Sequence, residues 1–365
     1  MNSKERIHIC LDHKEADRVP IQCWYTPEVA EYLKDVLGIK SSKQPQMDYQ
    51  LDIELGNDLL YTQVGILNSF NVIYNPKRRT GKDTFVCDWG IKWKKVPHEG
   101  GVYAEMVEHP LAGDMKKLDS YRTPNPNNEE EYKITKEVVK KYGKDYAIVG
   151  CAGSTVFEAS WYLRGMEQFL IDLVKNQDFV NALMDKILEY NLIASKKLVE
   201  IGVDILNLGD DVGMQTNMLI SPQLYRKYIK PRYAKIIEEC KKINPNLKVA
   251  YHTDGYVEPV IQDFIEIGID ILHPIQPESM KPGEIKKKYG SKLSFWGTVD
   301  VQYVMQFGKT KEVINEVKER IKTVAPRGGF ILCPAHYVQP SDRAIDNIFA
   351  FYWAANKYGK YPIKV

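Results

Sequence analysis

The sequence lacks any long apolar run. A helix that spans a bilayer needs about 18 or more consecutive apolar residues, and no stretch of the 365 residues reaches that length. The first 14 residues are interrupted by charged side chains and contain no apolar signal-peptide core. We therefore expect no membrane partner and a cytoplasmic location.

The sequence also lacks an excess of either charge. Its 50 lysines and arginines nearly balance 48 aspartates and glutamates, which leaves a formal net charge of +2. Short lysine clusters, such as residues 286–288, are typical of solvated helix faces when they stand alone. A dedicated nucleic-acid-binding protein would show a basic excess or stripe, so we expect no nucleic-acid partner.

Cysteine pairs, repeats and low-complexity linkers are absent as well. The six cysteines are scattered, and none forms a C-x-x-C pair; they are Cys10, Cys23, Cys87, Cys151, Cys240 and Cys333. Such spacing excludes a disulfide framework and a thiolate zinc finger. It predicts reduced thiols inside a large globular chain.

What the sequence does contain is a regular alternation of short apolar runs and longer helical patterns. A serine and a proline at 221–222, for example, are an N-cap and first-turn signal for a helix over 223–242. Eight such units predict one α/β domain over residues 1–365, a (β/α)₈ TIM barrel. A doubly wound sheet is the alternative, but no G-x-G-x-x-G follows the first run. The eight runs are 19–24, 58–61, 146–150, 203–208, 248–251, 269–272, 292–296 and 329–332.

One segment, residues 62–118, interrupts this alternation. It is rich in aromatic and β-branched residues separated by turn signals, as in 84–90 and 100–103. We interpret it as β-hairpins inserted after the second strand, capping the barrel mouth and shaping a substrate pocket. A purely structural role for any one of its residues is the alternative.

Polar side chains follow most of the predicted strands. In a TIM barrel the chemistry lies at the carboxyl ends of the strands, so these residues converge on one rim. Helix capping is an alternative explanation for any single aspartate, because aspartate is favoured at helix N-termini. The residues concerned are Glu158, Asp210, Asp211, Gln215, His252, Asp254, Gln276, Asp300 and His336.

Three of these residues form a candidate metal site. His252, Asp254 and His336 offer two imidazoles and a carboxylate from two strand ends. Such a set can hold a divalent metal and leave a position open for substrate. A hydrogen-bonded pocket histidine is the alternative reading of either histidine. We interpret the nearby Cys333 as a small buried residue.

Several blocks along the chain carry a family resemblance. They include Glu5-Arg6, 17–20 (DRVP), 209–215 (GDDVGMQ), 220–222 (ISP) and 328–336 (GGFILCPAH). The sequence resembles the uroporphyrinogen decarboxylase superfamily over nearly its whole length, and is most similar to the corrinoid-dependent methyltransferase branch. The resemblance implies a TIM barrel and suggests a homodimer.

The chain departs from the true decarboxylases at the first strand. That family carries an M-R-Q-A-G-R type of segment there, whose arginines bind acidic porphyrin side chains, whereas residues 22–27 here contain no arginine. Asp58 matches the position of the decarboxylases' catalytic aspartate. Without the arginines, a substrate with eight carboxylates is disfavoured.

The chain also departs from methyltransferases that deliver methyl groups to a thiol. Their zinc site uses an H-x-C motif and a later cysteine, and the matching positions here are His252, Asp254 and His336. Nitrogen and oxygen ligands make a harder Lewis acid than thiolates do. The resemblance thus implies Zn²⁺ or another divalent metal suited to removing methyl from oxygen or nitrogen.

Our hypothesis from the sequence is an O-demethylase methyltransferase. The metal, or an acid such as Asp210 or Asp211, polarises the ether oxygen of a small methoxylated donor, because an alkoxide leaves poorly without stabilisation. The Co(I) corrinoid of a partner protein accepts the methyl group. Asp58 completes the expected catalytic set. The expected substrate-binding residues are Trp24, Tyr25, Glu158, Gln215, Tyr251, Gln276, Trp296 and Asp300, with Tyr337 as a further aromatic candidate.

Three other functions remain open at this point. One is methyl transfer from a methylated corrinoid to a thiol, and another is a metal-free lyase that acts on a different acid through Asp58 and His336. The third is a binding protein that keeps the barrel only as a scaffold.

Overall fold

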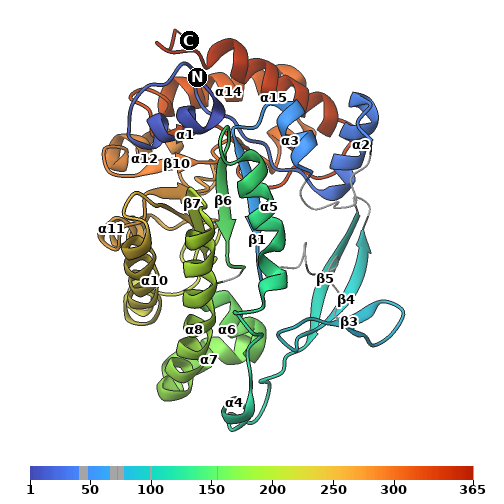
Figure 1. Cartoon of the computed structure of the whole chain (residues 1–365), viewed down its shortest axis with the longest axis vertical. Coiled ribbons are helices and arrows are strands. Elements are labelled where there is room, and N and C mark those ends of the chain that lie inside the picture. The colour runs from blue at the N-terminus through green and yellow to red at the C-terminus, as the bar shows by residue number, and fades with distance from the viewer. Residues whose placement is uncertain (41–47, 66–71, 73–77, 99–100, 154, 365) are drawn as a thin grey trace.

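The protein forms a barrel of parallel strands enclosed by helices, as the computed structural model shows for residues 1–40, 48–65, 72, 78–98, 101–153 and 155–364 (Figure 1). Seven strands pair in the order β1-β6-β7-β8-β9-β10-β11, each parallel to the next. The predicted α/β barrel is confirmed. The strands are β1 (Leu59–Gln63), β6 (Ala147–Cys151), β7 (Ile205–Gly209), β8 (Lys248–His252), β9 (Ile271–His273), β10 (Ser294–Trp296) and β11 (Phe330–Ile331).

The first predicted strand, residues 19–24, is an extended segment in which Ile21 makes an isolated parallel bridge to Leu332. Gln22 N–H donates to the Leu332 carbonyl at 2.9 Å, and on the other side Asp58 N–H donates to the Ile21 carbonyl at 2.8 Å. Pro20 has no N–H to donate, which limits a regular ladder here. The segment therefore closes the barrel between β11 and β1 without being a full strand.

Small and branched apolar side chains fill the barrel interior. On β6, Ala147 and Val149 face inward, whereas Ile148 packs with the outer core beneath the helices. Helix α1 (Ser3–Leu11) places Ile7 and Leu11 in the interior cluster, where they close the amino-terminal end of the barrel. The interior is thus a packed core, and only its carboxyl end is left for a pocket.

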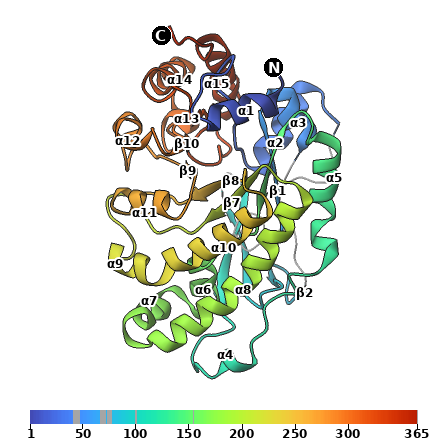
Figure 2. The same cartoon turned by 60° about the vertical axis from the view of Figure 1, so that its left-hand side comes forward.

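Helices cover the outside of the barrel, and the longest of them, α8, lies beside α10 (Figure 2). Ser221 caps its predicted helix by accepting a hydrogen bond from Leu224 N–H, and a π-helical turn at Tyr225–Ile229 interrupts that helix. The helices are α1 (Ser3–Leu11), α2 (Pro27–Leu37), α3 (Tyr49–Leu55), α4 (Lys117–Ser120), α5 (Lys133–Tyr142), α6 (Phe157–Arg164), α7 (Met166–Lys175), α8 (Gln177–Ile201), α9 (Pro222–Leu224), α10 (Lys230–Ile243), α11 (Ile261–Glu266), α12 (Pro282–Tyr289), α13 (Val304–Phe307), α14 (Thr310–Val324) and α15 (Ala344–Tyr358).

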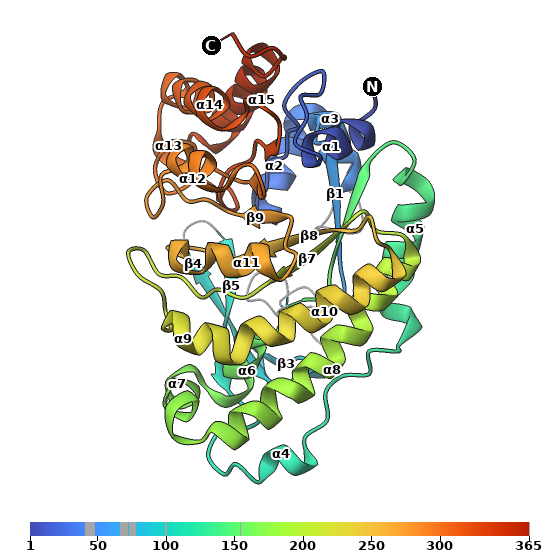
Figure 3. The same ribbon diagram turned by 90° about the vertical axis from the view of Figure 1, so that its left-hand side faces the viewer.

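The predicted insertion contains a second, antiparallel sheet (Figure 3). Its order is β2-β3-β4-β5, formed by β2 (Arg78–Arg79), β3 (Thr84–Val86), β4 (Lys92–His98) and β5 (Gly101–Glu108). Trp93 of β4 is fully buried and meets the ring of Tyr162 on α6 edge-on, with ring centroids 6.2 Å apart. The sheet is therefore anchored on α6. Residues 66–71, 73–77 and 99–100 of the predicted insertion lie outside the described residues.

Two sequence expectations concern the chain as a whole. All six cysteines are free and buried, as the scattered spacing predicted. Within the described ranges, no helix combines the length and the apolar composition that crossing a bilayer requires.

Candidate functional site

A pocket of about 190 Å³ opens at the carboxyl ends of the strands. Gln63 ends β1, Cys151 ends β6, Gly209 ends β7 and His252 ends β8, and all four line it. This is the end of the barrel at which we expected the chemistry. The lining consists of Trp24, Tyr61, Gln63, Cys151, Gly153, Glu158, Tyr162, Asn207, Leu208, Gly209, Asp211, His252, Asp254, His336 and Tyr337.

Three of the lining side chains lie at metal-ligand spacing. Asp211, His252 and Asp254 each offer one ligand atom, and these atoms lie within 4.8 Å of one another. His252 Nε2 is 3.9 Å from Asp211 Oδ1, and Asp254 N–H donates to the same Asp211 oxygen at 2.8 Å. Asp211, expected as an acid, thus lies with His252 and Asp254.

The surroundings of the three residues fit a bound cation. Asp254 Oδ1 is buried without a hydrogen-bond partner, which is costly for a carboxylate oxygen unless a cation accompanies it. In the described ranges neither Asp211 nor Asp254 forms an ion pair with a lysine or arginine. Two carboxylates and one imidazole suit Zn²⁺ or another divalent metal of similar hardness.

His336, the third predicted ligand, lies next to this group. Its Nε2 is 3.8 Å from Asp254 Oδ2. Burial lowers the pKa of His336, whereas burial raises the pKa of Asp254. A neutral imidazole is the form that binds a metal. The sequence-based set of His252, Asp254 and His336 is therefore gathered in one place, with Asp211 added to it.

His273, which the sequence places after the sixth predicted strand but which was not among the expected site residues, lies behind His252. The two Nδ1 atoms are 2.8 Å apart, and the His273 side chain is fully buried. Burial holds the pKa of His273 well below its ordinary value. His273 directly follows the predicted strand 269–272, just as His252 directly follows the predicted strand 248–251.

Asp210 corrects an expectation. Although it neighbours Asp211, it is fully buried and does not line the pocket. Its carboxylate accepts hydrogen bonds from the backbone N–H groups of Val156, Phe157 and Glu158 at 2.7 to 3.0 Å. Burial raises the pKa of Asp210 to about 6, although these N–H groups act against the rise. Asp210 therefore holds the start of α6 and does not face a substrate.

Glu158, which Asp210 holds in this way, does line the pocket. The Tyr162 hydroxyl, one helical turn further along α6, donates to its Oε1 at 3.1 Å. Burial, followed by the nearby charges of Asp211 and Asp210, raises the pKa of Glu158 well above the ordinary value. Its expected contact with substrate remains a prediction.

Aromatic rings form one wall of the pocket. Only some of the predicted aromatic residues belong to this wall. Trp24 lines it, with ring centroids 5.6 Å from Tyr61 and 5.3 Å from Tyr337. Tyr61 and Tyr162 were not anticipated. Tyr61 lies within an apolar strand, where its inward direction has no local signature.

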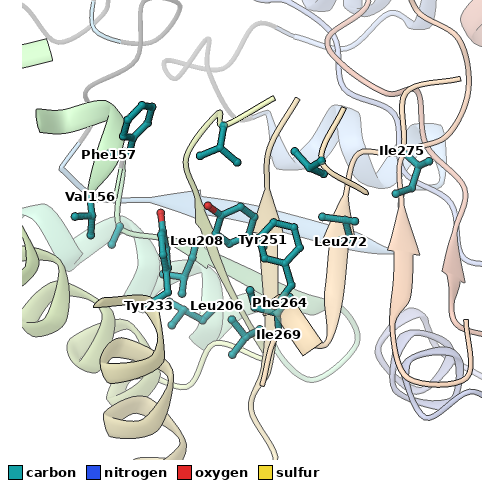
Figure 4. Close-up of a cluster of buried hydrophobic side chains, with 14 of the residues drawn as sticks. Val156, Phe157, Leu206, Leu208, Tyr233, Tyr251, Phe264, Ile269, Leu272 and Ile275 are labelled. Carbon is teal, nitrogen blue, oxygen red and sulfur yellow. The ribbon is translucent and has the colours of Figure 1, made fainter. Parts of the chain in front are cut away.

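Three predicted aromatic contacts lie elsewhere. Tyr251 is buried among the core residues outside β8, with its ring 4.6 Å from that of Phe264 (Figure 4). Trp296 is fully buried in the barrel interior below Trp24. Tyr25 turns its hydroxyl toward Asp52, to which it donates at 2.7 Å. None of the three lines the pocket, because each side chain points away from it or is covered.

Three predicted polar contacts lie in loops around the pocket. Gln276 accepts from Gly255 N–H at 2.6 Å, and Asp300 accepts from Tyr303 N–H at 2.9 Å. Gln215 is exposed and accepts from Gln302 Nε2 at 3.4 Å. None of the three is among the residues that line the pocket. These side chains link loops, and a substrate contact for them stays a prediction.

Asp58 is the clearest correction to the expected catalytic set. It precedes β1 at the amino-terminal end of the barrel, opposite the pocket, and is fully buried. Its carboxylate pairs with Arg6 and Arg18 at 2.7 Å each and accepts from Ile21 N–H at 2.8 Å. It therefore ties α1 and the closing segment to the barrel. In TIM barrels this end serves stability.

Fold and site together define an α/β barrel protein with an acidic, histidine-containing pocket at the carboxyl ends of its strands. The family model for uroporphyrinogen decarboxylase (URO-D) matches residues 89–358, and the chain belongs to this family. A uroporphyrinogen decarboxylase of Rickettsia rickettsii (strain Sheila Smith) is 22% identical over 340 residues, covering 89% of each chain. That of Rickettsia canadensis (strain McKiel) is 24% identical over 349 residues, covering 91% of this chain and 93% of the relative.

A solved structure shares the fold over the whole chain. It is described as a methyltransferase from Methanosarcina mazei and superposes with a TM-score of 0.71 at 19% identity. The match covers 98% of this chain and 99% of that chain. The family and its barrel fold, both expected from the sequence, are thereby confirmed.

Proposed function

We propose that this protein is a methyltransferase that moves a methyl group from a small, uncharged methoxylated compound to the corrinoid of a partner protein. The observation that most directly supports this proposal is the group of Asp211, His252 and Asp254, which lies at metal-ligand spacing inside a pocket with an aromatic wall. The likeness in fold to a protein described as a methyltransferase supports the same reading.

The composition of the pocket favours a donor without negative charge. The lining contains three carboxyl side chains, Glu158, Asp211 and Asp254, but no lysine or arginine among the described residues. A divalent cation would balance the charges of Asp211 and Asp254. An anionic donor would then have no side-chain cation to pair with, and burying an unpaired charge is costly.

This charge pattern also argues against uroporphyrinogen as the substrate. A tetrapyrrole with eight carboxylates needs cationic partners, and residues 22–27 supply none. The family's expected catalytic aspartate position, Asp58, lies at the far end of the barrel. A thiol acceptor is disfavoured because the candidate ligands are carboxylates and imidazoles rather than thiolates.

Different residues of the chain would have different roles in such a transfer. Asp211, His252 and Asp254 would hold a divalent metal, whose Lewis acidity would stabilise negative charge on the departing oxygen. Trp24, with the neighbouring tyrosine rings, would orient a flat donor against this group. The same rings would exclude water, which strengthens every electrostatic interaction in the pocket.

One experiment tests the reaction directly. The protein is mixed with a reduced corrinoid protein and a panel of methoxylated aromatic compounds, and the absorbance of the methylated corrinoid is followed. Formation of that species with uncharged donors is expected. Release of CO₂ from a carboxylated compound, with no methylated corrinoid, would instead support a lyase.

A second experiment tests the metal group independently of the reaction. The metal content of purified protein is measured for the wild type, His252→Ala and Asp254→Asn, with His98→Ala on the insertion as the matched control. We expect about one equivalent in the wild type and the control, and weaker binding in the two site variants. His252→Ala removes a ligand atom, and Asp254→Asn removes the negative charge of a ligand. Equal metal content in all four proteins would contradict the proposed ligand set.

A further inference from the structure

Two histidines meet ring to ring below the pocket. His252 ends β8 and His273 ends β9, and they lie opposite each other in the register of the two parallel strands. Their Nδ1 atoms are 2.8 Å apart, whereas the ring centroids are 5.0 Å apart and the ring planes differ by 29°. Because the nitrogens are so much closer than the centroids, the rings meet edge to edge through a hydrogen bond.

A hydrogen bond between two imidazole nitrogens links the states of the two rings. A neutral imidazole carries a proton on one nitrogen and a lone pair on the other. In the contact between His252 and His273 one Nδ1 must donate and the other must accept. The tautomer of one ring therefore fixes the tautomer of the other.

The position of Asp211 selects one of the two arrangements for a metal-binding state. His252 Nε2, 3.9 Å from Asp211 Oδ1, is the nitrogen that faces the carboxylates. It can offer a lone pair to a metal only if His252 keeps its proton on Nδ1. That proton then needs an acceptor, and His273 Nδ1 lies in position to accept it.

We propose that His273 is a positioning residue that holds His252 as the Nδ1–H tautomer, with Nε2 directed at Asp211 and Asp254. The inference rests on the metal site of the proposed function and deepens it. Partners of this kind orient metal-binding histidines and fix their tautomers in many metal sites. His273 itself would not touch the metal or the substrate.

The surroundings hold the His273 ring in this orientation. Its centroid lies 4.7 Å from both Trp24 and Trp296, and the side chain is fully buried. Gly297 has φ of +81°, and a Cβ atom there would lie 3.1 Å from the Cδ2 and Nε2 atoms of His273. The absence of a side chain at 297 thus leaves the room that the ring occupies.

Two substitutions at position 273 separate positioning from packing. Asn places an amide oxygen where the His273 Nδ1 lies and can still accept from His252, whereas Phe keeps a ring of similar size and cannot accept. We expect His273→Phe to weaken zinc binding by about 10- to 100-fold. His273→Asn should stay close to the wild type. A residue needed only for packing would give the reverse order.

The measurements use the full chain. Zinc affinity is measured by competition with a chromophoric chelator, and the free energy of unfolding by chemical denaturation. Tyr251→Phe, a buried change on β8 beside His252, serves as the control and should leave zinc affinity unchanged. In ¹⁵N spectra of the zinc-loaded wild type, His252 should carry its proton on Nδ1.

Three outcomes would overturn the inference. They are equal zinc affinity in His273→Phe and the wild type, weaker binding in Asn than in Phe, or a protonated His252 Nε2 in the zinc-loaded protein. A wild type that binds no zinc would overturn the metal site and this inference together. A wild type that binds zinc as expected but transfers no methyl group would overturn only the proposed reaction.

Discussion

Two carboxylates, the fully buried Asp58 and the half-buried Asp254, show how different partners give the same residue type different tasks. Both oxygens of Asp58 are bonded, to Arg6 and Arg18 among others. Asp254 keeps one buried oxygen without a partner. A completely satisfied carboxylate holds the fold together, whereas an unsatisfied one facing a pocket is available to a ligand.

Replacement of Asp58 should therefore reduce stability and leave catalysis intact. Asp58→Ala would remove the buried partner of Arg6 and Arg18, although Arg6 keeps its ion pair with Asp17. We expect the free energy of unfolding to fall by about 3 to 5 kcal/mol. Asp17→Asn, which alters only the exposed partner of Arg6, should cost less than about 1 kcal/mol. Denaturant titration measures both. If Asp58→Ala abolished turnover while the free energy of unfolding stayed unchanged, the result would support a catalytic role for Asp58 instead.

Asp52 offers a test of pH dependence away from the pocket. Burial raises its pKa to about 6, above the ~3.9 expected in the unfolded chain. The folded protein therefore binds an extra proton between these values. Its stabilising contribution is complete below about pH 4 and is lost as the pH rises through 6.

The variant Asp52→Asn isolates this contribution. From pH 4 to pH 7 the wild type should lose about 2 kcal/mol of unfolding free energy relative to Asp52→Asn. Denaturation curves of both proteins across this range provide the measurement. Parallel stability curves would show that Asp52 titrates normally in the folded protein.

At the scale of elements, helix α6 connects the core to the pocket. Asp210 binds three N–H groups at its start, and Glu158 in its first turn lines the pocket. Unpaired N–H groups at a helix start are stabilised by such an acceptor. The position of Glu158 thus depends on a carboxylate from the neighbouring loop.

Loss of that carboxylate should affect stability and activity together. We expect Asp210→Ala to lower the free energy of unfolding by about 2 kcal/mol, as the helix start loses its acceptor. Turnover should fall as well, since Glu158 is displaced. Ser221→Ala removes the cap of α9, away from the pocket, and should cost about 1 kcal/mol with no effect on turnover. If the two variants affected turnover equally, Asp210 would have no specific influence on the pocket.

The inserted sheet supports the pocket through Trp93. Trp93→Ala should destabilise the protein by about 3 to 5 kcal/mol, because a buried ring is removed. It should also raise the KM for the donor, since Tyr162 loses its neighbour, whereas Trp93→Phe should largely preserve both quantities. Denaturation and initial-rate kinetics test this. An unchanged KM in the Ala variant would limit the insertion to a structural role.

For the whole molecule, the lack of a lysine or arginine among the described residues of the pocket lining predicts a preference between donors. An uncharged methoxybenzene should exceed the corresponding methoxybenzoate in kcat/KM by at least about tenfold. Gln63→Arg, which introduces a cation at the pocket wall, should narrow the difference. Initial rates of corrinoid methylation with both donors measure it. Equal rates with both donors in the wild type would refute the inferred preference.

The barrel could be predicted because its signal is local. Apolar runs of strand length alternate with helical patterns, and all seven regular strands fall on predicted runs. Only residues 19–24 differ, because Pro20 lacks the N–H that a ladder needs. The insertion was recognisable by its composition, although its anchoring on α6 through Trp93 was not.

The candidate site could be predicted only in part. Each of four residues lies at or shortly after the end of a strand, and strand ends meet by the geometry of the barrel: Asp211, His252, Asp254 and His336. Asp210 follows the same strand as Asp211, yet its side chain points into the core. Tyr251 and Tyr61 both lie in apolar strands, and no local pattern tells which one faces the pocket.

The sequence by itself determined the barrel, the rim on which polar residues gather, and the absence of a cationic clamp for a polyanionic substrate. Tertiary structure alone decided which carboxylates lie together in the pocket, and which instead pair with Arg6 and Arg18 or bind the N–H groups at the start of α6. It also decided that His273 lies in hydrogen-bond contact with His252. The reason is physical. Periodicity along a chain records burial, whereas the task of a polar side chain depends on partners that are distant in sequence.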